Sequence, residues 1–311
     1  MFDSLFAKRP EVAEFLRQNG RSIGAAISVL GLAGFAYTFS RNLSPSEAGE
    51  MLRLHWMVLL LALGLYLITY VLMSTAWFVL ARGCGARIGY RLLAWAYLVS
   101  QIGKYLPGNV GHLLGRAYLA RNRGVPVDVS GIAMSLELTG VLAAGALFAT
   151  MAGILGPTSG DFSAVPIAAA VLALVLLAAV LFVSRRRLGG RPSLTRPFAV
   201  ALACYLPVFA LLAAANTILL GAASGPLILQ VAAAVVLSWL VGFMVPGAPA
   251  GLGLREMSFY ALLAGSFPGP TVLFAAAGMR LVTLTGDGIA WFVGLALGHF
   301  ARDVIPSPVP G

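Results

Sequence analysis

Residues 103–116, which read GKYLPGNVGHLLGR, are the feature that most constrains the fold of this chain. They lie in a strongly apolar region, yet they contain four glycines, a proline, a lysine, an asparagine, a histidine and an arginine. Pro107 and Gly108 interrupt a helix, and Gly111 lowers helix propensity further. In lipid, the backbone groups that such a break frees need protein or water as partners. We therefore predict two half-helices that meet at a break and line a polar cavity.

A second broken segment repeats this pattern 139 residues later, counted from Pro107 to Pro246. The two segments share L-x4-G-x3-P-G-x4-L-x2-R, which ends at Arg116 in the first copy and at Arg255 in the second. Paired segments of this kind in two halves of a chain point to a transporter-type site between repeats. The alternative is two unrelated loops that both contain Pro-Gly. We assign the backbone of the breaks to Gly103, Pro107, Gly108 and Gly111, and to Pro246, Gly247, Gly251 and Gly253.

The composition is that of a polytopic membrane protein. Of the 311 residues, 59% are hydrophobic and only 10% are charged, whereas about 25% are charged in soluble domains. We predict one all-α integral membrane domain over residues 1–311. The net charge of +10 does not indicate nucleic acid, because most arginines lie in short loops where they set topology and contact anionic headgroups. Cys84 and Cys204 lack metal-like spacing, so we expect no metal and no cofactor.

The apolar runs predict about six full transmembrane helices, at 21–40, 56–81, 129–155, 164–184, 197–221 and 271–300. The broken segments lie in two further stretches, 92–128 and 227–265. Basic loops flank the first stretch on both sides, so we predict re-entrant hairpins that enter from opposite faces as an inverted repeat. The alternative, two more full spans, fits the basic residues poorly. Both termini would be cytoplasmic, with residues 1–20 as a cytoplasmic or interfacial segment.

Charged side chains inside apolar runs are rare, and they mark functional sites or pair with one another. Arg280 and Asp287 are seven positions apart, two helical turns, so we expect them on one face of the last helix. Basic groups outnumber the acids here, and surplus guanidinium binds phosphate in a bidentate fork. Half-helix starts after the breaks add further N–H donors. We predict an anionic lipid headgroup contacted by Lys104, Asn109, His112, Arg116, Glu137, Arg255, Glu256, Arg280 and Asp287.

Two further possibilities concern the same residues. The carboxylates could simply pair with the arginines and hold the bundle together, for instance Glu137 with an arginine. Ser100 and Ser238 lack a partnered His–Asp set, and the carboxylates form no visible catalytic pair, so we do not predict an enzyme.

These residues resemble the transmembrane, or flippase, domain of lysylphosphatidylglycerol synthases, which is also found in stand-alone integral membrane proteins. The resemblance rests on GKYLPGNVGHLLGR with its basic loop, Glu137 in the next span, PGAPAGLGLRE, and Arg280 in the last long span. It covers nearly the whole chain. The family's second motif usually reads P-x-P-G-G-L-G-x-R-E, so Ala250 stands where a glycine is usual, a departure that should still permit the turn.

The resemblance implies a flippase-like lipid transporter of the bacterial inner membrane. The 311 residues contain no soluble aminoacyl-transferase domain, so the resemblance does not imply lipid synthesis. Stand-alone relatives are thought to handle other lipids, including glycolipids and polyprenyl-phosphate-linked sugars. Two alternatives remain: a non-transporting subunit that presents lipid to a partner glycosyltransferase or synthase, and an ion-coupled small-solute transporter that uses Glu137 and Asp287. A homo-oligomer is compatible with each.

Overall fold

The computed structural model describes residues 29–106, 111–155, 194–245 and 249–302, together with the single positions 26, 171, 174, 175, 178 and 182. These residues form helices and turns without a strand. Five of the described helices are long and apolar enough to cross a membrane. They are α3 (Pro45–Gly83), α6 (Val127–Leu155), α8 (Thr195–Leu220), α9 (Gly225–Met244) and α11 (Gly269–Arg302). The chain is therefore an all-α, multi-pass membrane protein, as predicted.

The helix α3 extends well beyond the span predicted at 56–81. It starts at a capping box, in which the Glu47 N–H donates to Ser44 Oγ at 3.3 Å and the Ser44 N–H donates to Glu47 Oε2 at 2.8 Å. Pro45 follows at the first helical position, where its missing N–H has no consequence. The 39 residues of α3 rise about 58 Å, roughly twice the hydrocarbon thickness of a bilayer. The charged stretch before the span is thus part of the helix.

Some of the other predicted spans match helices of the structure, and others lie wholly or partly outside its described residues. Those at 129–155, 197–221 and 271–300 correspond to α6, α8 and α11. Of the first span, residues 29–40 are helical, and this helix continues to residue 42. Residues 1–20 lie outside the described part of the chain, as does 164–184 apart from five single positions.

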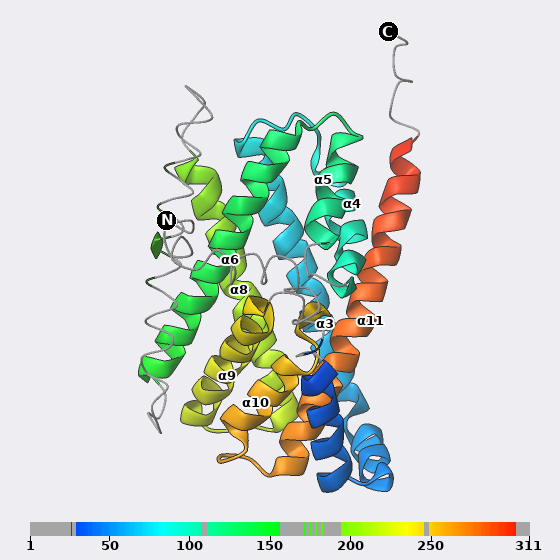
Figure 1. Cartoon of the computed structure of the whole chain (residues 1–311), viewed down its shortest axis with the longest axis vertical. Helices are drawn as coiled ribbons and strands as arrows, with labels where there is room; N and C mark the ends of the chain where they lie inside the picture. Colours follow the sequence, from blue (N-terminus) through cyan, green and yellow to red (C-terminus); the bar gives the residue numbers. More distant parts are fainter. Residues whose placement is uncertain are drawn as a thin grey trace, which may run out of the picture.

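The first broken segment forms two short helices, and the second forms one long and one short helix. The helices of the first are α4 (Tyr90–Ser100) and α5 (Gly111–Arg121), with the 3-10 turn η1 (Gln101–Tyr105) after α4. Around the second break lie α9, the turn η3 (Pro249–Gly251) and α10 (Leu254–Leu263). Figure 1 shows α4 and α5 in the upper half of the molecule and α9 and α10 in the lower half. At 20 residues, α9 is longer than a half-helix, because its apolar sequence runs without interruption.

Paired glycines let the backbone cross itself at each break. A Cβ on Gly103 would lie 2.7 Å from the carbonyl carbon of Gly111 and 2.7 Å from the nitrogen of His112. At the second break, a Cβ on Gly251 would lie 2.9 Å from the Cα of Gly242. Real Cβ atoms essentially never come this close. Because Gly103 and Gly242 are equivalent in the sequence repeat, both breaks use a similar crossing, and η1 also contacts η3.

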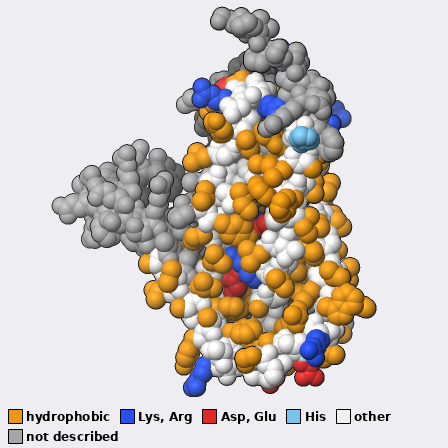
Figure 2. Space-filling view, turned by 90° about the vertical axis from the view of Figure 1, so that its right-hand side faces the viewer, with side chains coloured by type: hydrophobic (Ala, Val, Ile, Leu, Met, Phe, Trp, Pro, Cys, Tyr) orange, Lys and Arg blue, Asp and Glu red, His pale blue; other side chains and the backbone are white. Residues whose placement is uncertain are grey.

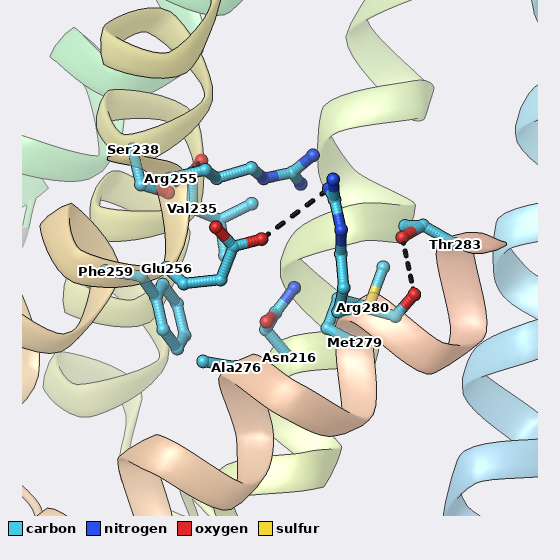
Figure 3. A pocket seen from close by; sticks show the side chains of 10 residues that line it. All are labelled: Asn216, Val235, Ser238, Arg255, Glu256, Phe259, Ala276, Met279, Arg280 and Thr283. Carbon is cyan, nitrogen blue, oxygen red and sulfur yellow. Dashed lines mark hydrogen bonds and ion pairs between the residues drawn. The ribbon is translucent and has the colours of Figure 1, made fainter. Parts of the chain in front are cut away.

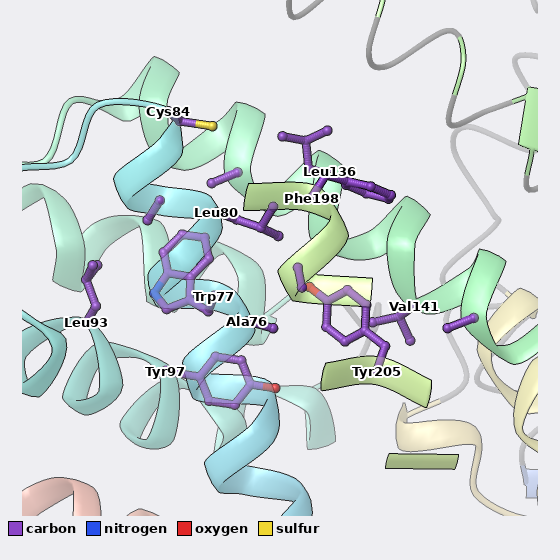
Figure 4. Packing of buried hydrophobic residues seen from close by; sticks show 14 of the residues in the cluster. Ala76, Trp77, Leu80, Cys84, Leu93, Tyr97, Leu136, Val141, Phe198 and Tyr205 are labelled. Atoms are coloured by element: carbon purple, nitrogen blue, oxygen red, sulfur yellow. The ribbon is translucent and has the colours of Figure 1, made fainter. Parts of the chain in front are cut away.

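Two apolar clusters pack the bundle, one toward each end. The first includes Trp77, Leu80, Tyr97 and Phe198, several of which are drawn in Figure 4. The second lies around α9, α10 and the start of α11, and includes Leu59, Leu219, Val231, Phe259 and Val272. The helices α3, α8 and α11 contribute to both clusters. Between the clusters these helices carry polar side chains, and the two breaks meet at the same level.

Candidate functional site

A cavity of about 230 Å³ lies between the two apolar clusters. Its walls come from both breaks and from the helices α3, α6, α8, α9 and α11. Seven of the nine predicted site residues line it: Lys104, His112, Arg116, Glu137, Arg255, Arg280 and Asp287. Glu256 lines a neighbouring cavity of about 30 Å³, together with Arg255 and Arg280. Asn109, Pro107, Gly108, Pro246 and Gly247 lie outside the described residues.

Arg116 is neutralised inside the protein. Its Nη1 donates to Glu137 Oε2, and the two side chains are 1% and 8% exposed. The guanidinium also lies 4.2 Å from the ring centroid of Tyr97 and 4.9 Å from that of Trp77, both cation–π contacts. Figure 4 shows Trp77 and Tyr97 among the buried residues of the first cluster. The ion pair between Glu137 and an arginine, weighed above as an alternative role, is therefore present, and it ties α5 to α3, α4 and α6.

Asp287 holds a second set of charges and hydroxyls together. Its side chain is 1% exposed, and its Oδ2 lies 2.7 Å from Lys104 Nζ. The Tyr66 hydroxyl donates to Oδ1 at 2.7 Å, Tyr70 donates to the same oxygen, and Tyr105 donates to Oδ2. One carboxylate thus connects α11 to α3 and to η1.

The sequence reasoning missed these tyrosines. Tyr66 and Tyr70 lie one helical turn apart in the middle of an apolar run. Tyrosine is enriched at the two membrane interfaces, so a pair of tyrosines in mid-span was the available signal for a polar partner nearby.

Arg280 and Arg255 form a third group, shown in Figure 3. Arg280 Nη1 lies 3.5 Å from Glu256 Oε1, while Glu256 Oε2 accepts a hydrogen bond of 2.7 Å from the Gly253 N–H at the start of α10. Arg280 Nε and Nη2 are buried without a hydrogen-bond partner in the described structure. None of the ion pairs among the described residues includes Arg255. In Figure 3 the guanidinium groups of Arg255 and Arg280 end close to each other.

The site carries a surplus of positive charge. Lys104, Arg116 and Arg280 each pair with one carboxylate, and Arg255 pairs with none in the described part of the chain. The predicted surplus of guanidinium is therefore located at Arg255, on α10, with the partly satisfied Arg280 next to it on α11.

The charged layer is visible from the outside of the bundle. Figure 2 shows acidic and basic side chains at mid-height on a flank that is otherwise largely apolar. This flank is the right-hand side of Figure 1, where α11 lies. Lys104 is the most exposed member of the three ion pairs, at 20%. Charged side chains of the interior thus reach the surface of the bundle on this apolar flank.

A comparison with protein families gives one match. The family model described as the lysylphosphatidylglycerol synthase TM region matches residues 22–290. This range includes both breaks and the charged residues of the cavity. No curated protein matches the chain.

Proposed function

The chain belongs to the lysylphosphatidylglycerol synthase transmembrane-region family, and we propose that it is a flippase-like transporter for a lipid with an anionic headgroup. The observation that carries the proposal is the surplus positive charge at Arg255 and Arg280, inside a cavity between the two broken segments. An unpaired guanidinium in a low-dielectric site favours an anionic ligand, and phosphate matches its forked geometry. We propose that the site binds and releases lipid without carrying out a reaction.

The size of the cavity restricts which part of a lipid it holds. Pockets that enclose a whole small-molecule ligand measure roughly 300–1,000 Å³, whereas this cavity measures about 230 Å³. A phosphate-containing headgroup fits this volume, but two acyl chains do not. We propose that the chains stay in the bilayer and that the headgroup enters through the flank on which the charges are visible (Figure 2).

The arrangement of the helices around the two breaks supports an inverted, two-sided access path. The helices α4 and α5, with 11 residues each, rise about 17 Å, half of a bilayer core. They open toward the end of the molecule that carries the exposed Arg82, Arg87 and Arg121, which we propose to be cytoplasmic by the positive-inside rule. The helices α9 and α10 open toward the other end (Figure 1). Two re-entrant hairpins of opposite orientation would let the cavity open to either leaflet in turn.

Leaflet transfer in reconstituted vesicles tests the proposal. The purified protein is placed in liposomes that contain a trace of fluorescent phosphatidylglycerol, and a membrane-impermeant quencher reports the fraction in the outer leaflet. We expect fast exchange for the wild type and a rate lower by about tenfold or more for Arg280→Ala, because a charge-assisted contact is lost. The matched control Arg87→Ala removes an exposed arginine from the α3–α4 turn and should retain the wild-type rate.

Three results would contradict the proposal. Absence of transfer in the wild type would favour a subunit that presents lipid to a partner enzyme. Equal rates for Arg280→Ala and the wild type would exclude the assigned headgroup site. Transport of a soluble solute, coupled to ions and lost on neutralising Glu137 or Asp287, would favour a small-solute transporter.

A further inference from the structure

The two halves of the sequence repeat differ at one position that decides the charge of the site. In the first half, Glu137 follows Arg116 by 21 positions. In the second half, the residue 21 positions after Arg255 is Ala276. Each lies on the long helix that follows its short helix, Glu137 on α6 after α5 and Ala276 on α11 after α10. The repeat therefore gives one arginine an acidic partner and the other a methyl group.

The structure gives the two arginines different surroundings. Arg116 and Glu137 form a buried ion pair. Arg255 and Ala276 line the same cavity of about 30 Å³, and Figure 3 shows both at its wall. Arg116 thus has a carboxylate against it, whereas in Figure 3 the Arg255 guanidinium ends near Arg280 and Ala276 lies on another part of the wall, beside Asn216 and Phe259.

The neighbouring groups do not replace the missing carboxylate. Glu256 lies 3.5 Å from Arg280 with one oxygen, and its other oxygen accepts from the Gly253 N–H. Arg280 Nε and Nη2 remain without partners in the described structure. Two guanidinium groups that end close together (Figure 3) repel each other unless an anion lies between them. The pair thus presents several donors and one uncompensated charge to the same space.

We propose that Arg255 and Arg280 form a clamp for a phosphate oxyanion, which occupies in the second half the role that Glu137 has in the first. The headgroup phosphate of a lipid is the expected source, a point that rests on the proposed function; free phosphate offers the same oxygens. Arg255, Arg280 and Thr283 line both cavities, so the phosphate lies at their common wall. About 30 Å³ accommodates a group the size of a water, hence one phosphate oxygen, while the rest of the headgroup occupies the larger cavity.

The three arginines then have different roles. Arg116 acts as a fixed brace and does not contact the ligand, whereas the clamp is confined to α10 and α11. Lys104 is held by Asp287 at 2.7 Å and stays outside the clamp. The second half of the chain is therefore the half that recognises phosphate.

A pair of variants at Ala276 tests the clamp without removing an arginine. Ala276→Glu supplies the carboxylate that the repeat lacks, and Ala276→Gln adds nearly the same volume without charge. Binding of inorganic phosphate by titration calorimetry, and of phosphatidylglycerol in nanodiscs, is measured for both. We expect Ala276→Glu to weaken both affinities by about tenfold or more, because it adds a negative charge to the cavity that Arg255 and Arg280 line, and Ala276→Gln to bind as the wild type does. Phosphatidylglycerol binding alone would support the clamp with the lipid as its ligand.

If both Ala276 variants lose binding because the larger side chain fills the cavity, variants of the arginines provide the test. Arg255→Gln and Arg280→Gln should each lower affinity for the probe that the wild type binds, and Arg87→Gln should not. Wild-type affinity in Arg255→Gln and Arg280→Gln, or failure of the wild type to bind either probe, would overturn the clamp. The clamp and the transport proposal can fail separately. Phosphate binding without leaflet transfer supports the clamp and contradicts transport. Leaflet transfer by a protein whose Arg255→Gln variant binds with wild-type affinity supports transport and contradicts the clamp.

Discussion

At the scale of single residues, the pair of Arg116 and Glu137 is the least exposed of the three ion pairs among the described residues. Both side chains are nearly inaccessible, so replacing one partner leaves the other charged and buried. We expect Arg116→Ala to lower the free energy of unfolding by about 3–5 kcal/mol, seen as a lower melting temperature in detergent. Arg116→Ala combined with Glu137→Ala should be more stable than the two single effects added together. An unchanged melting temperature in Arg116→Ala would contradict a bracing role.

Ala250 is the non-glycine residue with a positive φ in the described part of the chain. Its φ of 49° and ψ of 25° lie in the left-handed region, which a side chain disfavours by roughly 1–2 kcal/mol. Glycine removes this cost, although the unfolded chain gains some freedom. We expect Ala250→Gly to raise the melting temperature. The same change in the interior of α9, Ala233→Gly, should lower the free energy of unfolding by about 1 kcal/mol, the helix-propensity cost of glycine. A melting temperature that does not rise in Ala250→Gly would contradict the strain at Ala250.

The sequence singled out charged residues that the structure places around one cavity, but most of their pairings could not be predicted. Lys104, Arg280 and Asp287 stand out because charge in an apolar run is rare. Sequence spacing suggested that Arg280 and Asp287 share a helix face, and both line the cavity. Yet Asp287 pairs with Lys104 and Arg280 with Glu256, because each pairing depends on how the breaks meet α11. Three-dimensional contacts of this kind leave no periodic signal in one chain.

At the scale of elements, the glycine crossing at the first break makes a testable demand. A Cβ on Gly103 would meet the backbone of Gly111 and His112 at 2.7 Å, and backbone cannot yield as a side-chain tip does. We expect Gly103→Ala to push η1 and α5 apart and to reduce leaflet transfer together with the melting temperature. Gly64→Ala in α3 is the matched control, because a Cβ added at this position would have nothing within 4 Å. This variant should be neutral or stabilising. Equal behaviour of the two variants would contradict the crossing.

The extents of the elements show where sequence patterns suffice. The spans of α6, α8 and α11 follow from long, predominantly apolar runs between charged or glycine-containing turns. The early start of α3 at Pro45 depends on the capping box at Ser44 and Glu47, which lies in a charged stretch that hydropathy counts as flank. The repeat also suggested a short helix before the second break, but α9 has no interruption that would shorten it.

At the scale of the whole molecule, the helices around the two breaks, α4 with α5 and α9 with α10, open toward opposite ends of the bundle (Figure 1). If both pairs are re-entrant, the two ends of each pair are accessible from the same side of the membrane. Single cysteines, introduced into a chain whose Cys84 and Cys204 are replaced by alanine, report this through labelling by an impermeant reagent. We expect label from the cytoplasmic side at Arg87→Cys and Asn122→Cys, and from the opposite side at Ala223→Cys and Gly265→Cys.

The labelling pattern has a clear contrary outcome. If the first pair spans the membrane, Arg87→Cys and Asn122→Cys react from different sides, and if the second pair does so, Ala223→Cys and Gly265→Cys differ. Permeabilised membranes provide the control, since each cysteine must then react. A split pair would remove the inverted repeat and with it the two-sided access that the transport proposal requires.

The most direct test of the central claim is native mass spectrometry of the protein, extracted gently from its own membrane. The wild type is compared with Arg280→Ala and with the exposed-arginine control Arg87→Ala. We expect the wild type and Arg87→Ala to retain one anionic lipid. We expect Arg280→Ala to lose this lipid, because the headgroup phosphate is held at the cavity wall. Retention of the same lipid in Arg280→Ala, or no specific lipid in the wild type, would contradict a headgroup site between the two breaks.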